Sequence, residues 1–160
     1  MKEKNLQIII RKAKIEDIPK IIPLLRGIAQ YHHKLNPIYT PGSKIPSDAP
    51  QRLAKLVRKI KAVLIVAESN GKLVGYFVAD IRKTRMRVYN KIGYIQDGFV
   101  DQKYRRKNIG KDLFDWIKEW FLKHNVKRIE LMVDSNNPAG IKAWQKYGFK
   151  EYQKKMQIEI

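Results

Sequence analysis

Apolar residues spaced three and four positions apart predict four helices in this chain. The first pattern begins at Asp17-Ile18-Pro19, because proline is tolerated in a first helical turn, and Pro23 is expected to kink or divide that helix. A second pattern covers about residues 50–61, and a short one covers about 137–147. The most strongly amphipathic pattern covers 109–123, where large apolar residues form one face of the helix.

Shorter apolar runs, separated by turn signals, predict strands. The run Ser69-Asn70-Gly71-Lys72 is typical of a hairpin turn between two of them. Gly98, close to the end of another run, indicates a bulge or a close approach of the backbone. The expected strands cover residues 6–11, 62–67, 73–79, 92–100 and 127–133, with one or two more between residues 149 and 160.

The order of these elements predicts a mixed α/β (α+β) fold in a single domain of residues 1–160. Antiparallel hairpins and a β-α-β unit over residues 92–133 imply a mixed sheet of six to seven strands with helices on both faces. The proline-rich segment 36–50 is unusually long for a connection within a compact domain. Such loops often bind ligands or act as lids, and we expect this role here.

The formal net charge of +19 has two interpretations. It favours binding to an anion such as nucleic acid, an acidic protein or a phosphorylated cofactor. It is also typical of a lysine-rich thermophile proteome, and the scatter of basic residues along the chain favours this second interpretation. The absence of cysteine excludes disulfides and thiolate metal sites. Without a membrane-length apolar run or a signal-peptide pattern, a cytoplasmic location is expected.

The segment from Phe99 to Lys111 combines the end of a strand, a basic loop and the start of a helix. The first N–H groups of a helix have no internal partner and, with the helix dipole, attract anions. Gly110 allows a ligand to approach the backbone closely. The segment therefore predicts a phosphate site, although an ordinary helix capped by Asn108 behind a solvated basic loop explains it equally well. The added positive charge comes from Arg105, Arg106, Lys107 and Lys111.

Two motifs in this part of the chain resemble the signatures of the Gcn5-related N-acetyltransferase (GNAT) superfamily. The first, Arg105-x-x-Asn108-x-Gly110, is similar to the family's pyrophosphate loop, Arg/Gln-x-x-Gly-x-Gly/Ala. The second, Asn137-x-x-Gly140-x-x-x-Trp144-x-Lys146-x-Gly148-Phe149, is similar to Asn-x-x-Ala-x-x-x-Tyr-x-Lys-x-Gly-Phe. They occur in the expected order with one helix and one strand between them, and the resemblance covers nearly the whole chain.

This resemblance implies a mostly antiparallel GNAT-type sheet and acetyl-CoA as co-substrate. The amine would attack the thioester directly, while backbone N–H groups near the end of the 92–100 strand polarise the carbonyl. The pantetheine arm would lie between the 92–100 and 127–133 strands. The residues that the resemblance assigns to acetyl-CoA binding are Phe99, Val100, Arg105, Arg106, Lys107, Asn108, Ile109, Gly110, Lys111, Asn137 and Trp144.

Departures from the family pattern bear on the proton transfers. Trp144 stands where the family usually has a tyrosine that protonates the CoA thiolate, and an indole N–H has no useful acidity. Tyr147, one turn further on, is a candidate substitute. The candidate base is Asp97, placed by strand alternation on the face of Ile95 and Phe99, where burial would raise its pKa.

Glu130 is the second candidate base, followed by Asp134, and surface ion pairing is the alternative role for each acid. Acceptor specificity is expected from Tyr31, Tyr39 and the loop 36–50, whereas His32 and His33 are interpreted as helix-end residues.

We therefore expect an acetyl-CoA-dependent N-acetyltransferase acting on a protein N-terminus, a lysine or a small amine. One alternative is a basic nucleic-acid-binding module, for which Arg82 to Arg87 with Tyr89 is the best candidate element. The other is a CoA-binding homologue with weak catalysis, as the Trp144 departure suggests. A homodimer is plausible by analogy with the fold, because sheet edges often pair between subunits.

Overall fold

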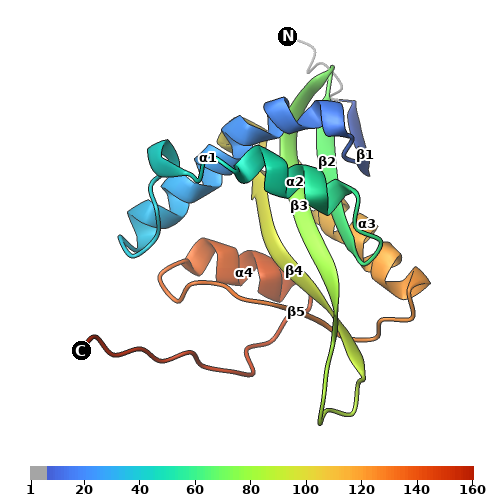
Figure 1. The fold of residues 1–160 in the computed structure, drawn as a ribbon, viewed down its shortest axis with the longest axis vertical. Helices are drawn as coiled ribbons and strands as arrows, with labels where there is room; N and C mark the ends of the chain where they lie inside the picture. The colour runs from blue at the N-terminus through green and yellow to red at the C-terminus, as the bar shows by residue number, and fades with distance from the viewer. Residues whose placement is uncertain (1–6) are drawn as a thin grey trace.

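The computed structural model describes residues 7–160 and contains one five-stranded sheet (Figure 1). Its strands lie in chain order, and each antiparallel pair is joined by a short turn or by helices. Only the last two strands run parallel, which confirms the predicted β-α-β unit. The strands are β1 (Ile8–Lys12), β2 (Ala62–Ser69), β3 (Lys72–Lys83), β4 (Lys91–Val100) and β5 (Ile129–Leu131).

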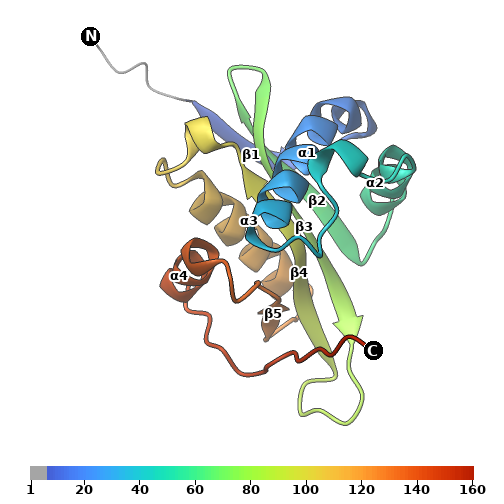
Figure 2. The same ribbon diagram turned by 90° about the vertical axis from the view of Figure 1, so that its left-hand side faces the viewer.

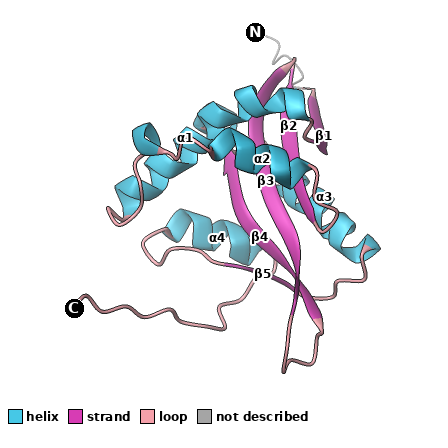
Figure 3. Ribbon diagram, viewed as in Figure 1, coloured by secondary structure: helices cyan, strands magenta, loops and turns pink. Residues whose placement is uncertain are grey.

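Helices cover both faces of the sheet (Figures 2 and 3). On one face lie α1 (Ile18–Leu35) and α2 (Ala49–Val57), and on the other α3 (Ile109–Lys123) and α4 (Pro138–Lys146). Short 3-10 turns add Ile15–Asp17, Gly42–Lys44 and Gln102–Tyr104. The predicted fold class is confirmed. No helix among the described residues is long and apolar enough to cross a membrane.

The two faces of the sheet carry separate apolar cores. Leu113, Ile117 and Phe121 of α3 are fully buried against one face. On the other face, Ile21 of α1 packs with Tyr76 of β3, and neither side chain has exposed surface. Because each core is dominated by residues at helical or alternating spacing, the hydrophobic pattern located both correctly.

A bulge in β4 changes which face its side chains occupy. Val78 pairs with Asp97 and Ala79 pairs with Ile95, so Gln96 is the extra residue. Ile95 consequently faces the α3 core, whereas Asp97 lies on the α1 face with Phe99. The expectation that Asp97 shares a face with Ile95 is wrong, because strict alternation does not survive the inserted residue.

Three further expectations need correction. The first helix continues through Pro23 and is not divided there. The sheet has five strands among the described residues, fewer than the six to seven expected. The missing strands are those predicted after residue 148, since residues 149–160 form no regular secondary structure and pair with no strand. Leu6, the expected start of the first strand, lies outside the described residues.

Strands β4 and β5 are paired for only a short distance. Their register ends at Ile95 opposite Leu131, while β4 continues to Val100 along β3. Beyond Ile95, the backbone groups of β4 that face the β5 side therefore have no strand partner in the described structure. This open stretch leads directly into the loop before α3.

Candidate functional site

The loop before α3 has the backbone of an anion-binding site. Arg106 and Asn108 both adopt the left-handed conformation, with φ of 62° and 61°. The N–H groups of residues 106–111 find no acceptor within the described part of the chain. Successive free N–H groups at a helix start form a concave donor set suited to phosphate oxygens. Asparagine tolerates this backbone better than most residues, so the replacement of the family's first glycine is accommodated.

The basic side chains of this loop do not all point to one place. The Arg105 Nε donates to the Val100 carbonyl at 3.1 Å, and its guanidinium lies 5.5 Å from the Tyr31 ring and 5.6 Å from Phe99. Lys111 pairs with Asp115 on the next turn of α3. Arg106 and Lys107 are exposed and make no ion pair among the described residues. They are the cations best placed to meet an incoming phosphate.

The end of β4 offers one of the two predicted main-chain donors. The Asp101 N–H bonds to the Val74 carbonyl, so the amide of residue 101 points toward β3. Because neighbouring amides point to opposite sides, Val100 directs its N–H toward the open β5 side, where Arg105 also meets its carbonyl. Phe99, paired with Tyr76, directs its N–H into the β3 ladder. The geometry thus supports Val100 as a donor and does not support the Phe99 backbone in that role.

Asp97 sits in a setting suited to a base. Its Oδ2 accepts from the Tyr76 hydroxyl at 2.5 Å, and its Oδ1 accepts from the Gly98 N–H at 2.9 Å. Burial raises the pKa of Asp97 above its ordinary value, and the Tyr76 hydrogen bond offsets part of that rise. Burial and the neighbouring Asp97 charge also keep the pKa of Tyr76 well above 10. The phenol therefore remains a donor to the carboxylate.

Glu130 lies in a different setting, an ion-pair cluster on β5. One carboxylate oxygen accepts from Arg87 at 2.9 Å and from Arg128 at 2.7 Å, and the other accepts from Tyr152 at 2.8 Å. Burial opposes ionisation, but these three donors outweigh it and the pKa of Glu130 is lowered. A carboxylate saturated with cations is a poor proton acceptor, so the structure favours the ion-pair role.

Trp144 and Tyr147 belong to an aromatic cluster that joins α4 to α3. Trp144 packs at 5.8 Å from Phe77 and 6.1 Å from Phe114, and Tyr147 stacks on Phe114 at 5.1 Å. A Cβ added to Gly110 would meet the Tyr147 hydroxyl at 3.3 Å, so that hydroxyl lies beside the first turn of α3. Burial raises the pKa of Tyr147, which keeps it a neutral donor at the phosphate loop.

Asn137 begins α4 and is buried. Its Oδ1 accepts from the Gly140 N–H at 2.9 Å and from the Tyr31 hydroxyl at 2.8 Å. Residues 106 positions apart in the chain thereby connect α1 to α4 across the end of the sheet. The side-chain amide nitrogen stays free to meet a ligand, because the oxygen carries both of these contacts.

A second acid, which the sequence ranked last, joins Asp97 near the end of α1. The His32 ring lies in the last turn of α1, 6.0 Å from the Tyr31 ring and 5.6 Å from the Tyr39 ring. The pKa of Asp134 is lowered, chiefly by the Asn136 backbone N–H, and Asn36 also contacts it at 3.4 Å. The position of His32 is that expected of a helix-end residue. Asn36 is the residue that sequence reasoning missed here, although it begins the proline-rich segment expected to border the acceptor.

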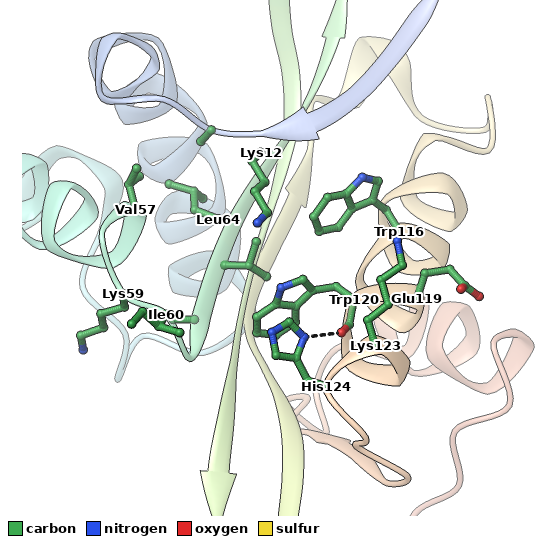
Figure 4. Close-up of a pocket in the computed structure, with 13 residues that line it drawn as sticks. Lys12, Val57, Lys59, Ile60, Leu64, Trp116, Glu119, Trp120, Lys123 and His124 are labelled. Atoms are coloured by element: carbon green, nitrogen blue, oxygen red, sulfur yellow. Dashed lines mark hydrogen bonds between the residues drawn. The ribbon is translucent and has the colours of Figure 1, made fainter.

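A groove of about 630 Å³ lies at the other end of the molecule (Figure 4). It is bordered by the start of β2 and the C-terminal half of α3, with Trp116, Trp120 and Lys12 among its lining residues. None of the predicted site residues contributes to it. The candidate site is therefore the surface formed by the ends of β4, α1 and α4 and the start of α3.

Comparisons with known proteins identify the family of this chain. The model of the acetyltransferase (GNAT) family matches residues 28–149, a range that contains both motifs. An uncharacterised N-acetyltransferase of Methanocaldococcus jannaschii is 28% identical over 96 residues, which are 60% of this chain and 42% of that protein. The match thus spans less than half of the relative's length.

Solved structures show the same fold. A tetramutant of the BH1408 protein of Bacillus halodurans superposes with a TM-score of 0.85 at 24% identity, covering 95% of this chain and 99% of that one. The aminoglycoside N-acetyltransferase AAC(6')-Iy, solved with CoA, gives 0.79 at 16% identity, with 100% and 99% covered. Together with the family match over most of its length, this shows that the chain belongs to the acetyltransferase (GNAT) family, as its two motifs predicted.

Proposed function

We propose that the protein transfers the acetyl group of acetyl-CoA to a primary amine by direct attack. The observation that carries this proposal is the placement of a phosphate-binding backbone, an open main-chain donor and a raised-pKa carboxylate along one path. That path runs from the start of α3 through Val100 to Asp97. The AAC(6')-Iy structure was solved with CoA, which supports the choice of co-substrate.

The residues present fit CoA at several points. The free N–H groups of residues 106–111 suit its pyrophosphate, and Arg106 and Lys107 supply neutralising charge. Gly110 leaves room at the first turn, beside which the Tyr147 hydroxyl lies, and this hydroxyl would donate to the bound pyrophosphate. The Asn137 amide lies at the start of α4, on the route to the open side of β4.

Acetyl-CoA supplies a thioester whose carbonyl carbon accepts an amine. The Val100 N–H polarises the carbonyl oxygen, since it points to the open side of β4 and needs no rearrangement to donate. The Asp97 carboxylate takes the proton that the ammonium must lose before it attacks. As the new C–N bond forms, the C–S bond breaks and the electrons leave on sulfur.

Asp134 and Asp97 have different roles toward the acceptor amine: Asp134 attracts it and Asp97 deprotonates it. The lowered pKa of Asp134 keeps it anionic, so it attracts an ammonium group into a protein that is otherwise strongly positive. The raised pKa of Asp97 makes it the better base. Two carboxylates whose environments separate their pKa values are typical of such a division. Tyr31 and Tyr39 border this region and select the rest of the acceptor.

The departing thiolate is protonated by solvent. Trp144 lies in the aromatic cluster and has no acidic hydrogen. Tyr147 has its hydroxyl beside the first turn of α3, and its raised pKa makes it a poor acid. We therefore assign Tyr147 to a hydrogen bond with bound CoA and Trp144 to the wall of the pocket.

Thiol release tests the reaction directly. The chain contains no cysteine, so free CoA can be followed with a thiol reagent without protein background. A panel of peptide N-termini, lysine peptides, polyamines and small amines should contain at least one acceptor with saturable, enzyme-dependent release. Asp97→Asn should slow this release by at least about 100-fold while acetyl-CoA binding is kept. Tight acetyl-CoA binding with no turnover on any amine would instead indicate a CoA-binding homologue without catalysis.

A further inference from the structure

Strand β1 is shorter than β2 and leaves the start of β2 open along one edge. The register of the two strands ends at Lys12 opposite Ile65, and the Ala13 N–H adds one further bond, to the Leu64 carbonyl at 2.8 Å. Strand β2 begins two residues earlier, at Ala62, where it pairs with β3. In the described structure, the first residues of β2 therefore have a strand neighbour on the β3 side alone.

The backbone of Ala62 points to this open side. The Ile81 N–H donates to the Lys61 carbonyl at 2.8 Å, so these two residues form a hydrogen-bonded pair. Antiparallel pairs alternate between bonded and non-bonded, and the next pair, Ala62 with Asp80, is therefore non-bonded. Ala62 thus directs both its N–H and its carbonyl away from β3, and neither has a partner within the described chain. An added extended segment would use this donor and acceptor.

The space beside this edge is the groove of about 630 Å³, and both of its walls are apolar (Figure 4). Val57 and Ile60, from the end of α2 and the turn after it, border one side, and Trp116 and Trp120 of α3 border the other. Ile60 is 88% exposed. An exposed aliphatic side chain opposite two indoles marks an interaction surface, so the groove suits apolar side chains that enter from an added segment.

The charges around the groove favour an acidic occupant. Three lysines line it, Lys12, Lys59 and Lys123, and none of them makes an ion pair among the described residues. The ammonium group of Lys12 points toward the two indoles, whereas the carboxylate of Glu119, the one acid in this lining, points away from the groove (Figure 4). Cations without a carboxylate partner beside apolar walls attract a ligand that combines acidic and apolar groups.

Strand alternation fixes how an added segment would lie. Val63 belongs to the core under α3 and Leu64 to the core under α1, so the Ala62 side chain faces the α1 and α2 side. Partners in an antiparallel pair face the same side of a sheet. A residue paired with Ala62 would therefore face Val57 and Ile60. The residue before it, opposite Val63, would face the two indoles of α3.

We propose that this groove binds an extended, acidic segment of a partner protein, which continues the line of β1 along β2. One residue of the segment exchanges two main-chain hydrogen bonds with Ala62, and the preceding residue places a large apolar side chain on the indoles. Acidic residues on either side of this pair meet Lys12 and Lys123. The groove shares no residue with the candidate acetyl-CoA site, so the proposal does not depend on acetyl transfer.

Fluorescence anisotropy of a labelled peptide tests the proposal on the full chain. The probe is fluorescein-labelled Asp-Asp-Glu-Phe-Ile-Glu-Asp-Asp, in which phenylalanine is meant for the indoles and isoleucine for the residue paired with Ala62. It should bind saturably at one site per chain. The same peptide with two serines in place of Phe-Ile keeps the charge and should bind at least about 10-fold more weakly, because two apolar side chains lose their burial. Equal binding of both peptides, or no saturable binding, would overturn the proposal.

A substitution on the apolar wall locates the bound peptide. Ile60→Ser should weaken binding by at least about 5-fold, because the peptide isoleucine loses its contact with this side chain. Since Ile60 is 88% exposed, the variant is expected to fold like the wild type. The matched control is Ile158→Ser, which removes an isoleucine that is 86% exposed elsewhere on the chain, and it should bind normally. An equal effect of the two variants would place the peptide outside the groove.

Charge reversal separates the groove from the general positive charge of the protein. Lys12→Glu with Lys123→Glu should weaken peptide binding by at least about 10-fold, because two attractive contacts become repulsive. Lys154→Glu with Lys155→Glu makes the same change of net charge on exposed residues near the C-terminus and should have a much smaller effect. Equal losses would refute a specific site. Displacement of the peptide by an RNA oligonucleotide that binds more tightly through Lys12 and Lys123 would show a nucleic-acid site instead.

Methylation of single peptide nitrogens tests the strand pairing. The N–H of the peptide isoleucine should donate to the Ala62 carbonyl, so N-methylation at this residue should weaken binding by about 10-fold. The N–H of the glutamate that follows points away from β2, because neighbouring amides alternate, and its methylation is the control. An equal effect at both positions would show that the peptide does not add to β2 as a strand, which would overturn the proposal.

Discussion

Removing the Tyr76 hydroxyl tests the environment assigned to Asp97. Tyr76 has no exposed surface, and Tyr76→Phe keeps its ring in the core while deleting the 2.5 Å hydrogen bond. Among the described residues, the Asp97 carboxylate would then retain the Gly98 N–H as its one donor. A hydrogen bond to an ionised group contributes about 1.5–3 kcal/mol, and a neutral one about 0.5–1.5 kcal/mol. The variant should therefore lose about 1.5–3 kcal/mol of unfolding free energy when Asp97 is ionised, and less when it is protonated.

The sign of the pH dependence follows from the raised pKa of Asp97. A carboxyl group with a raised folded-state pKa favours folding most when protonated, and that contribution is lost as the pH rises through the folded-state pKa. Without the Tyr76 donor the pKa of Asp97 rises further. The stability difference between wild type and variant should consequently grow from acidic to neutral pH, starting above the ordinary aspartate pKa of 3.8.

Urea unfolding of both proteins at about pH 4 and about pH 8 measures this difference. Tyr94→Phe is the control, because its hydroxyl makes no hydrogen bond among the described residues, and it should change little at either pH. An equal loss for Tyr76→Phe at both pH values would refute the reasoning. It would show that the Tyr76 hydroxyl contributes equally whether or not Asp97 is ionised, so that Asp97 is not a partly desolvated carboxylate whose charge this hydroxyl stabilises.

Three other outcomes follow from the structure. Asp97→Asn should lower kcat by at least about 100-fold with little change in acetyl-CoA affinity. Turnover by the wild type should rise with pH through the raised pKa of Asp97, and a pH-independent rate would contradict the assignment of Asp97 as the base. Gly110→Leu should weaken acetyl-CoA binding in titration calorimetry, because a Cβ at residue 110 already lies 3.3 Å from the Tyr147 hydroxyl and the rest of the side chain must enter the space kept for the phosphates. Gly110→Ala, which the family signature accepts, is the control and should bind nearly as well as wild type; equal affinity of the leucine variant would show that the phosphates bind elsewhere. Asp17→Asn should cost about 1.5–3 kcal/mol in urea unfolding, because it breaks a 2.6 Å pair with Arg11. Since the pKa of Asp17 is lowered in the folded state, its contribution to the stability of the wild type is lost as the pH falls through that pKa. The difference in unfolding free energy between wild type and Asp17→Asn should therefore shrink in acid, and a difference that persists there would contradict the assignment.

Local patterns predicted most of the elements. The apolar face of α3 and the basic loop before it are properties of consecutive residues, so both could be located from the sequence. Gly98 indicated a bulge or a close approach of the backbone in this strand, but the sequence did not show that Gln96 is the extra residue, because that depends on how β4 registers against β3. This inserted residue places the Asp97 side chain on the α1 face of the sheet, where it accepts the Tyr76 hydrogen bond. Spacing arguments along a single strand cannot supply such a contact.

Contacts between distant segments were also beyond the sequence. The Tyr31 hydroxyl meets Asn137 only because α1 and α4 converge at the end of the sheet. Glu130 looked like a candidate base from alternation alone, yet Arg87 and Arg128 surround it in the fold. The strands expected near the C-terminus had the right alternation, but residues 149–160 pair with no strand of the described structure. In each case the sequence could not show which distant residue or strand lies next to the one in question.

Calorimetric titration with acetyl-CoA tests the central claim most directly. The wild-type protein should bind one acetyl-CoA per chain, far more tightly than ATP and with only mild sensitivity to salt. Arg106→Ala with Lys107→Ala should weaken that binding, while Lys118→Ala with Lys123→Ala, an equal change of charge on the distal part of α3, should not. Binding that ATP matches and salt abolishes would contradict the account, because the loop before α3 would then be only an anion-binding patch.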